Sequence, residues 1–340
     1  MLYFCLIFSV FIGLGLYYEP EVGLDKHHGL PNGHDLDIRS NGFKVKSDLR
    51  IAVVIPVIHP ALMEITQGFI STLKAMLPDV IVTIFNAQSN SILMSQHIEH
   101  IITEGYDLIF TVGSRCSLMA QEITLKKRVN IPIIFAGVSN PEQMGLGAAY
   151  VTGVTQEYQY ESQCRLLLKL VPSIKTLLLI YDPMQGNGLS KDRERIEDFL
   201  KLHRVMLKTL EVSSMVLMRD NMMALIRDAD AVLVLKDNTV ISAIESIIAL
   251  CNHVHIPLIT SDLASGKKGA ALSYGIEESS FGVEAAHLAK RILEEQELPS
   301  DLPIVKLNNF CLRVNKKELI SQGLKIEKDL MFFIESGKVC

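Results

Sequence analysis

The sequence predicts an α/β protein of two doubly wound, Rossmann-like lobes joined by a hinge, with a hydrophobic segment at the N-terminus. Three observations carry this prediction: eight short apolar runs, a constant spacing that relates the first four runs to the last four, and amphipathic stretches between them. Hydrophobic residues make up 49% of the 340 residues and aromatic residues only 6%, which is typical of buried parallel strands. The length suggests two domains of ordinary size.

The first 18 residues, MLYFCLIFSVFIGLGLYY, carry no charge. They predict an export signal or membrane anchor over 1–18, with a buried or wrongly assigned start as the alternative. Cys5 lacks the small neighbours of a lipoprotein cleavage site, so cleavage, lipidation and retention all stay open. Residues 19–49 are polar and aperiodic, which is typical of a linker. We therefore expect an exported protein, either periplasmic or anchored on the outer side of the membrane.

The apolar runs fall into two sets of four that look like copies of one βαβαβαβ unit. Corresponding runs begin 125, 125, 124 and 125 residues apart. Strands that alternate with helices predict a parallel sheet with right-handed crossovers in each unit. The first set covers 51–57, 80–87, 107–113 and 131–138, and the second covers 176–182, 205–212, 231–237 and 256–262.

The stretches between the runs repeat apolar residues at helical spacing, for example over 62–76 and 243–251. The charged run DRERIED at 192–198 predicts a solvated helix face. A further helix is expected where Ala285, Ala286, Leu288, Ile292 and Leu293 recur.

The ends of the two units predict how the chain divides. Segments 151–155 and 273–277 are expected to be crossings of a hinge, and 304–315 a third. Lobe 1 would then comprise 50–154 and 277–305, and lobe 2 would comprise 155–276 and 306–335. Three crossings allow bending without unfolding of either core.

Ligands of doubly wound sheets bind beyond the carboxyl ends of the strands, so we expect the binding site in the turns there. These turns carry small hydrogen-bonding residues, which also suit helix N-caps, and capping alone is the alternative interpretation. The candidate ligand-binding residues are His59, Pro60, Gln88, Gly113, Ser114, Ser139, Asn140, Asn187, Asp237, Asn238 and Asp262.

Other classes of site find little support. The sequence contains no GxxxxGK[ST], GxGxxG or GxSxG motif, so we expect no nucleotide or other cofactor and no catalytic residue. Cys251, His253 and His255 lack a nearby fourth ligand, so no metal is expected. A net charge of -5 without a basic block argues against nucleic-acid binding.

Several stretches carry a family resemblance: HPAL (59–62), NAQSN (86–90), IPIIFAGVSNPEQMGL (131–146), VTGVTQ (151–156), DNTVISA (237–243), IPLITSD (256–262) and VNKKELISQGLKIEKDL (314–330). From about Leu49 to Leu330 the chain resembles substrate-binding proteins of ABC transporters, in the branch associated with tryptophan and tyrosine uptake. The resemblance implies a type I periplasmic-binding-protein fold that closes on a small solute and delivers it to a permease with its ATPase. It also implies a protein that is not an enzyme.

The sequence departs from the family pattern in two turns. VGSRCS (112–117) places Arg115 near the expected cleft, and YGIEESSFG (274–282) has Glu277 and Glu278 where the family tends toward aromatic residues. Both departures bear on the identity of the solute.

An α-amino acid would need partners for both of its charges, because burying either one alone costs several kcal/mol. Ser114 and Ser139 offer hydroxyls and amides to the carboxylate. Asp237 and Asp262 offer acceptors to the ammonium group, and His59 with Pro60 would line the side-chain pocket. The alternative is a neutral solute such as a sugar, in which case the two aspartates only cap helices.

Two other functions stay open from the residues alone. A two-domain Rossmann-like enzyme such as a glycosyltransferase would need a nucleotide site or a positioned acid and base. A ligand-sensing domain would be favoured by a fused helix-turn-helix or signalling module, and residues 1–49 contain neither.

Overall fold

A computed structural model of the chain describes residues 49–156, 159–183, 189–212 and 215–324. The chain divides into two units, 1–45 and 46–340, and the described residues belong to the second. The expected export segment over 1–18, nearly all of the linker, Asn187 and the last residues of the resemblance lie outside the described residues.

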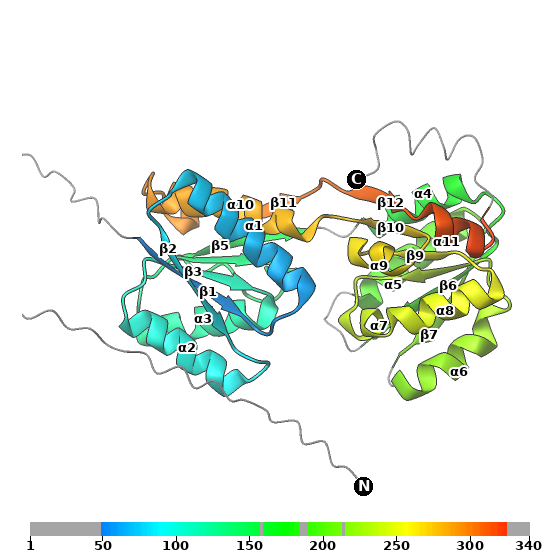
Figure 1. Ribbon diagram of the computed structural model, residues 1–340, viewed down its shortest axis with the longest axis horizontal. Coiled ribbons are helices and arrows are strands. Elements are labelled where there is room, and N and C mark those ends of the chain that lie inside the picture. The colour runs from blue at the N-terminus through cyan, green and yellow to red at the C-terminus, as the bar shows by residue number, and fades with distance from the viewer. Residues whose placement is uncertain (1–48, 157–158, 184–188, 213–214, 325–340) are drawn as a thin grey trace, which may run out of the picture. The chain divides into compact units, whose positions relative to one another are not determined.

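Lobe 1 contains a six-stranded, all-parallel sheet in the order β11-β5-β4-β3-β1-β2. Helices α1 and α10 cover one face and helices α2 and α3 the other (Figure 1). The strands are β1 (Arg50–Ile55), β2 (Ile81–Asn86), β3 (Leu108–Val112), β4 (Ile133–Ala136), β5 (Val151–Gln156) and β11 (Val305–Leu307). The helices are α1 (Pro60–Met76), α2 (Ser91–Thr103), α3 (Ser114–Lys127), α10 (Glu278–Leu293) and the 3-10 turn η1 (Pro299–Asp301).

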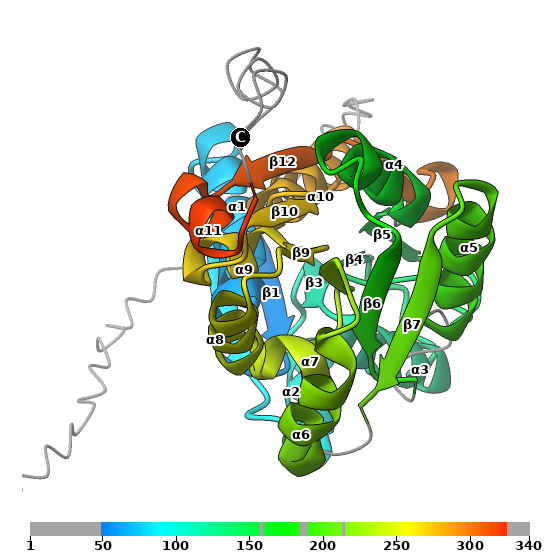
Figure 2. The ribbon, with the colours of Figure 1, turned by 90° about the vertical axis from the view of Figure 1, so that its right-hand side faces the viewer.

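Lobe 2 repeats this plan in the order β12-β10-β9-β8-β6-β7 (Figure 2), with β12 antiparallel to β10. Its strands are β6 (Thr176–Tyr181), β7 (Met206–Glu211), β8 (Ala231–Val234), β9 (Leu258–Thr260), β10 (Leu272–Gly275) and β12 (Cys311–Val314). Its helices are α4 (Tyr160–Leu170), α5 (Leu189–Leu202), α6 (Met215–Ile226), α7 (Asn238–Ser242), α8 (Ile244–Val254), α9 (Leu263–Lys268) and α11 (Lys316–Ser321).

The predicted repeat is confirmed, because all eight apolar runs form strands and both sheets place them in the same order. The expected unit of four strands was incomplete, since each sheet gains two more. Much of 151–155 and 273–277, expected as hinge crossings, pairs within the sheets as β5 and β10. These strands escaped prediction because they are short or polar, reading VTGVTQ and LSYG instead of an aliphatic run.

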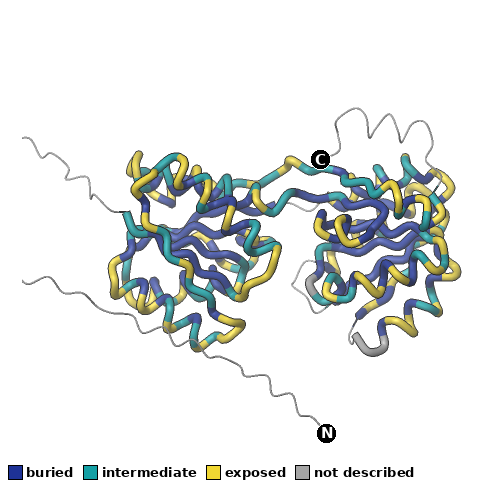
Figure 3. Tube along the Cα trace, viewed as in Figure 1, coloured by how far each residue is buried: buried dark blue, intermediate teal, exposed yellow. Residues whose placement is uncertain are grey.

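The central strands are buried on both faces (Figure 3). In β1, Ile51, Val53 and Ile55 pack beneath α1 and α10. Ala52 and Val54 point to the opposite face, beneath α2 and α3. This alternation explains why β1 reads as a continuous apolar run rather than an alternating one.

Helices α1 and α10 approach closely because each carries a glycine where they meet. A Cβ atom at Gly282 would lie 2.5 Å from the Phe69 nitrogen and closer still to the Ile65 carbonyl oxygen. A Cβ atom at Gly68 would meet the Ser279 backbone in the same way. Beneath this contact, Phe69 stacks on Phe110 with 4.0 Å between ring centroids.

Replacing Gly282 by alanine should lower the free energy of unfolding by about 3 kcal/mol, because backbone atoms cannot yield to the added methyl group as a side chain would. Urea denaturation of the ligand-free protein measures this loss. The control is His287→Ala, an exposed position on the same helix, which should change stability by less than about 0.5 kcal/mol. Equal effects of the two substitutions would contradict the close contact.

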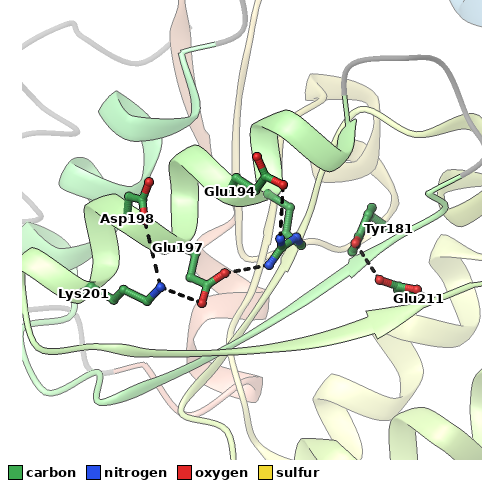
Figure 4. A network of polar contacts seen from close by, with 7 residues as sticks. Tyr181, Glu194, Glu197, Asp198, Lys201 and Glu211 are labelled. Carbon is green, nitrogen blue, oxygen red and sulfur yellow. Dashed lines mark hydrogen bonds and ion pairs between the residues drawn. The ribbon is translucent and has the colours of Figure 1, made fainter.

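The charged run of α5 forms a solvated face, as predicted. Glu197 pairs with Arg193 at 2.6 Å and with Lys201 at 2.9 Å (Figure 4). Nearby, the Tyr181 hydroxyl donates to Glu211 at 2.8 Å and joins the ends of β6 and β7. Asp192, in the first turn of α5, is more enclosed, and burial raises the pKa of its carboxyl to about 6 despite the proximity of Arg195.

Asp192 should therefore make stability depend on pH. The folded protein binds this proton more tightly than the unfolded chain, so the free energy of unfolding falls as pH rises from about 4 to 6. Asp192→Asn should raise the free energy of unfolding at pH 7 by about 1 kcal/mol, an amount reduced by solvent screening. The gain should be much smaller at pH 4, where the folded wild-type carboxyl is already protonated.

Urea denaturation at both pH values checks this expectation. Asp198→Asn on the same helix is the control and should stay within about 0.5 kcal/mol of the wild type at each pH. A gain for Asp192→Asn that is the same at pH 4 and pH 7 would show that the carboxyl is not the cause.

Cys116, Cys164 and Cys251 are free and buried, and burial raises the pKa of each thiol to about 12. They are small core residues and not reactive thiolates. Cys311 is in a disulfide bond. No helix within the described ranges is both long and apolar enough to span a bilayer.

Candidate functional site

The strand order places a binding crevice at a defined point in each sheet. In the first sheet, β1 lies between β2 and β3, and the chain leaves β1 for α1 on one face and β3 for α3 on the other. The turns after these two strands therefore diverge, and such a divergence is where doubly wound sheets bind ligands. The second sheet repeats the arrangement with β6 and β8.

The structure brings the candidates of lobe 1 to this one edge. His59 and Pro60 begin α1, Gly113 and Ser114 begin α3, and Gln88 lies in the turn between β2 and α2. Ser139 and Asn140 follow β4. His59, Pro60, Gln88 and Asn140 are exposed, whereas Gly113, Ser114 and Ser139 are half-buried.

The backbone of these turns is unusual at three candidates. Gly113 has a φ of 85°, Gln88 a φ of 50° and Asn140 a φ of 52°. Glycine and asparagine adopt this left-handed region most readily. The turns therefore present backbone groups as well as side chains at the edge of the sheet.

On the lobe 1 edge, the turns that open α1, α2 and α3 are electropositive. The fourth helix that begins there, α10, starts with Glu278, whose charge is paired with Lys236. The first turns of α1, α2 and α3 contain no acidic residue, so the partial positive charge of each helix N-terminus is not offset there. Arg115 adds a full charge at the start of α3, and its guanidinium donates to the Ser91 hydroxyl at 2.6 Å. These turns favour an anionic group.

The candidates of lobe 2 include two buried helix caps. Asp237, only 1% exposed, caps α7 by accepting from the Thr239 and Val240 amides at 2.9 and 3.1 Å. Its other oxygen accepts from the Asp182 amide at 2.6 Å, which ties the end of β8 to the end of β6. Burial raises the pKa of the Asp237 carboxyl, and these three amide hydrogen bonds oppose that rise.

Asp262, at 6% exposure, caps α9. Its oxygens accept from the Ser265 amide at 2.8 Å and from the Ser265 hydroxyl at 2.7 Å. Both aspartates therefore cap helices, which the alternative interpretation of the sequence also predicts. Asp262 accepts fewer hydrogen bonds from the protein than Asp237 and so has more capacity left to accept from a ligand. The Asn238 side chain and all of Asn187 lie outside what the structure describes.

The two acidic departures from the family pattern have basic partners. Glu277 accepts from Arg313 of β12 at 2.6 Å. Glu278, the first residue of α10, accepts from Lys236 at 2.6 Å, and the Lys236 ammonium lies 5.4 Å from the centre of the Phe281 ring. Lys236 lies between β8 and α7 in lobe 2, whereas Glu278 belongs to α10 in lobe 1. The Lys236–Glu278 ion pair therefore joins the two lobes.

The cluster Cys251, His253 and His255 is not assembled as a metal site. Cys251 is buried, and the His255 Nδ1 lies 2.8 Å from the Ser321 carbonyl oxygen. Across the described ranges, no three His, Cys, Asp or Glu side chains are grouped so that they could hold a metal ion.

Asp182 and Lys236 lie in the strand-end turns that the sequence indicates, but neither they nor Gln156 were among the candidate ligand-binding residues. The Asp182 carboxylate accepts a hydrogen bond from the Thr239 hydroxyl at 2.9 Å. No spacing in the sequence indicates this contact. Gln156 ends β5 and is buried without a partner for its carboxamide oxygen. The one available signal was the position of Gln156 at the end of the VTGVTQ stretch.

Asp237→Ala should lower the free energy of unfolding of the ligand-free protein by about 2–3 kcal/mol, because three backbone amides lose their acceptor. Asp262→Ala removes an acceptor that bonds only to Ser265, so the free energy of unfolding should fall by about 1 kcal/mol. Urea denaturation measures both, with Asp198→Ala on the surface of α5 as control. A loss for Asp237→Ala no larger than the control would contradict the capping geometry.

The comparison with known families gives a match over most of the chain. A model of the family described as ABC transporter substrate binding protein matches residues 50–336. An uncharacterized protein of Rickettsia prowazekii (strain Madrid E) is 26% identical over 282 residues, covering 83% of this chain and 88% of that protein. The tyrosine-binding protein of Clostridioides difficile (strain R20291) is 24% identical over 293 residues, covering 82% and 83%.

Among solved structures, the ABC domain from Streptococcus pneumonia in complex with L-Trp has a TM-score of 0.71 at 20% identity. The match covers 84% of this chain and 98% of that chain. This likeness concerns the fold.

Proposed function

Since the chain belongs to the ABC transporter substrate-binding protein family, we propose that it binds an aromatic α-amino acid at the strand-end turns of its two lobes. Proteins of this family bind small solutes and deliver them to ABC transporters. Family membership favours solute binding over the enzyme and sensor alternatives. The tyrosine-binding relative and the L-Trp complex support the solute class.

The observation that carries the proposal is the difference in charge between the turns that open α1, α2 and α3 and the turns that open α7 and α9. The lobe 1 edge combines Arg115 with three helix N-termini that lack acids, whereas the lobe 2 edge carries Asp182, Asp237 and Asp262. A zwitterion needs both, because each of its charges must be paired when it leaves water. A neutral sugar needs neither.

On the lobe 1 side, the solute carboxylate would be bound by the turns at Ser114 and Ser139. In these turns Gly113 and Asn140 would let the backbone come close to the solute. Ser114 opens α3, whose free amides suit an anion. Gln88 would add an amide, and the exposed His59 with Pro60 would contact the aromatic ring.

On the lobe 2 side, the solute ammonium group would be bound mainly by Asp262. A carboxylate can accept about four hydrogen bonds, of which Asp262 uses two and Asp237 three in holding the protein together. Asp237 therefore has less to offer a ligand. Asn238 and Asn187 remain candidates for either group of the solute.

We propose that the protein acts outside the cytoplasm, with residues 1–18 as signal or anchor and 19–49 as linker. The uncharged, apolar start supports this. The family is extracytoplasmic, and an ABC permease with its ATPase would be the partner.

Isothermal titration calorimetry of the purified protein with L-tyrosine and L-tryptophan tests the solute class. We expect binding of at least one of the two, and no binding of glucose. Asp262→Asn should weaken that binding by about 2 kcal/mol, because it removes the charge from a buried pair. Asparagine caps a helix as well as aspartate does, so the fold should be kept.

The control variant Asp198→Asn removes the same charge from an exposed face of α5 and should bind like the wild type. Binding of glucose together with no response to either amino acid would refute the proposed solute. Unchanged affinity in Asp262→Asn would refute the assignment of the ammonium site.

A further inference from the structure

The carboxamide oxygen of Gln156, at the end of β5, is buried without the hydrogen bond that such an atom needs. Gln156 is 8% exposed, and its carboxamide oxygen is sealed from solvent with no hydrogen-bond partner. The other buried polar side chains of β5 are satisfied. Thr152 donates to the Leu302 carbonyl at 3.0 Å and Thr155 donates to the Val138 carbonyl at 2.6 Å.

The position of Gln156 is set by its neighbours in the sheet. β5 lies between β4 and β11, and Gln156 is paired with Leu307 of β11. The hydrogen bond from Thr155 ties the end of β5 to the turn that carries Ser139 and Asn140. Gln156 therefore belongs to the carboxyl edge at which the candidate site lies.

The direction of the Gln156 side chain follows from the alternation along a strand. Gln156 shares a face with Val154, which packs beneath α1 and α10. These two helices begin at this edge, α1 at Pro60 and α10 at Glu278. The carboxamide is thus at the edge of the sheet on the side where the N-termini of two helices begin.

An unpaired carboxamide in such a place destabilises the protein, because its bonds to water are lost and nothing replaces them. Natural structures rarely keep such a group unless another molecule satisfies it. The atom that lacks a partner is an acceptor, so the missing group is a donor. In an α-amino acid, the ammonium group supplies three N–H donors.

We propose that Gln156 is a ligand-binding residue whose carboxamide oxygen accepts a hydrogen bond from the ammonium group of the bound solute. This inference rests on the proposed function and adds a lobe 1 contact to a group otherwise bound by lobe 2. The ammonium group is then held from both lobes, which couples its recognition to their closure.

The test compares Gln156→Met with the wild type by calorimetry, using whichever of L-tyrosine and L-tryptophan the wild type binds. Methionine has a similar length and no amide. We expect an affinity loss of about tenfold or more, together with an unchanged or raised melting temperature of the ligand-free protein. A residue that only supports the fold would not separate these two readouts.

Gln163→Met is the matched control. Gln163 is also a buried glutamine, but its amide donates to the Thr260 carbonyl at 3.0 Å and its oxygen accepts from the Ser261 hydroxyl at 2.8 Å. Its replacement should lower the melting temperature of the ligand-free protein. Gln156→Met should not, because there is no hydrogen bond to lose.

The deaminated analogue of the bound amino acid, 3-(4-hydroxyphenyl)propionate or 3-(indol-3-yl)propionate, identifies the group that Gln156 contacts. The wild type and Gln156→Met should bind this analogue equally. An equal loss for the amino acid and the analogue would overturn the ammonium contact, and so would an amino-acid affinity that Gln156→Met leaves unchanged. If the wild type binds neither amino acid, the proposed function fails together with this inference.

Discussion

Every pair of neighbouring strands in the two sheets is parallel except β10 and β12, and parallel neighbours are joined by long crossovers rather than by tight turns. In both lobes nearly all of these crossovers contain a helix, which returns over the sheet and starts again at the opposite edge. The carboxyl ends of the strands and the N-termini of the helices therefore gather along one line. Free amides, caps and turns collect there as a consequence of topology.

What distinguishes the two edges is the set of side chains that the sequence places in that common framework. On lobe 1 the first turns of α1, α2 and α3 are without acids, and Arg115 stands beside Ser91. On lobe 2 the caps are aspartates. The same aspartates hold backbone amides in place, so part of their hydrogen-bonding capacity is spent on the fold. A residue such as Asp237 thus serves structure first, and its contribution to binding is limited by the acceptor sites that remain.

The sequence was sufficient for the strands with aliphatic runs, since repetition at a constant spacing reinforced each weak signal. It was insufficient for β5 and β10, which are short or polar. These segments form strands because they pair with β4 and β9. The same limit applies to the site. The turns could be located from topology, whereas the partners of Glu277 and Glu278 come from distant segments. The burial of the Gln156 oxygen without a partner is a property of the folded structure, and a single glutamine gives no pattern in the sequence from which to infer it.

The close contact between α1 and α10 has a consequence for the order in which the protein can fold during its synthesis. Helix α1 lies near the start of the described chain, and its partner emerges from the ribosome only after β6 to β10 have been made. Until then the side of α1 at Gly68, which lies against the backbone of Ser279, has no partner helix. Lobe 1 therefore cannot complete its core on a nascent chain, whereas most of lobe 2 is contiguous. The leading part of the chain therefore stays without a complete core until α10 has been made.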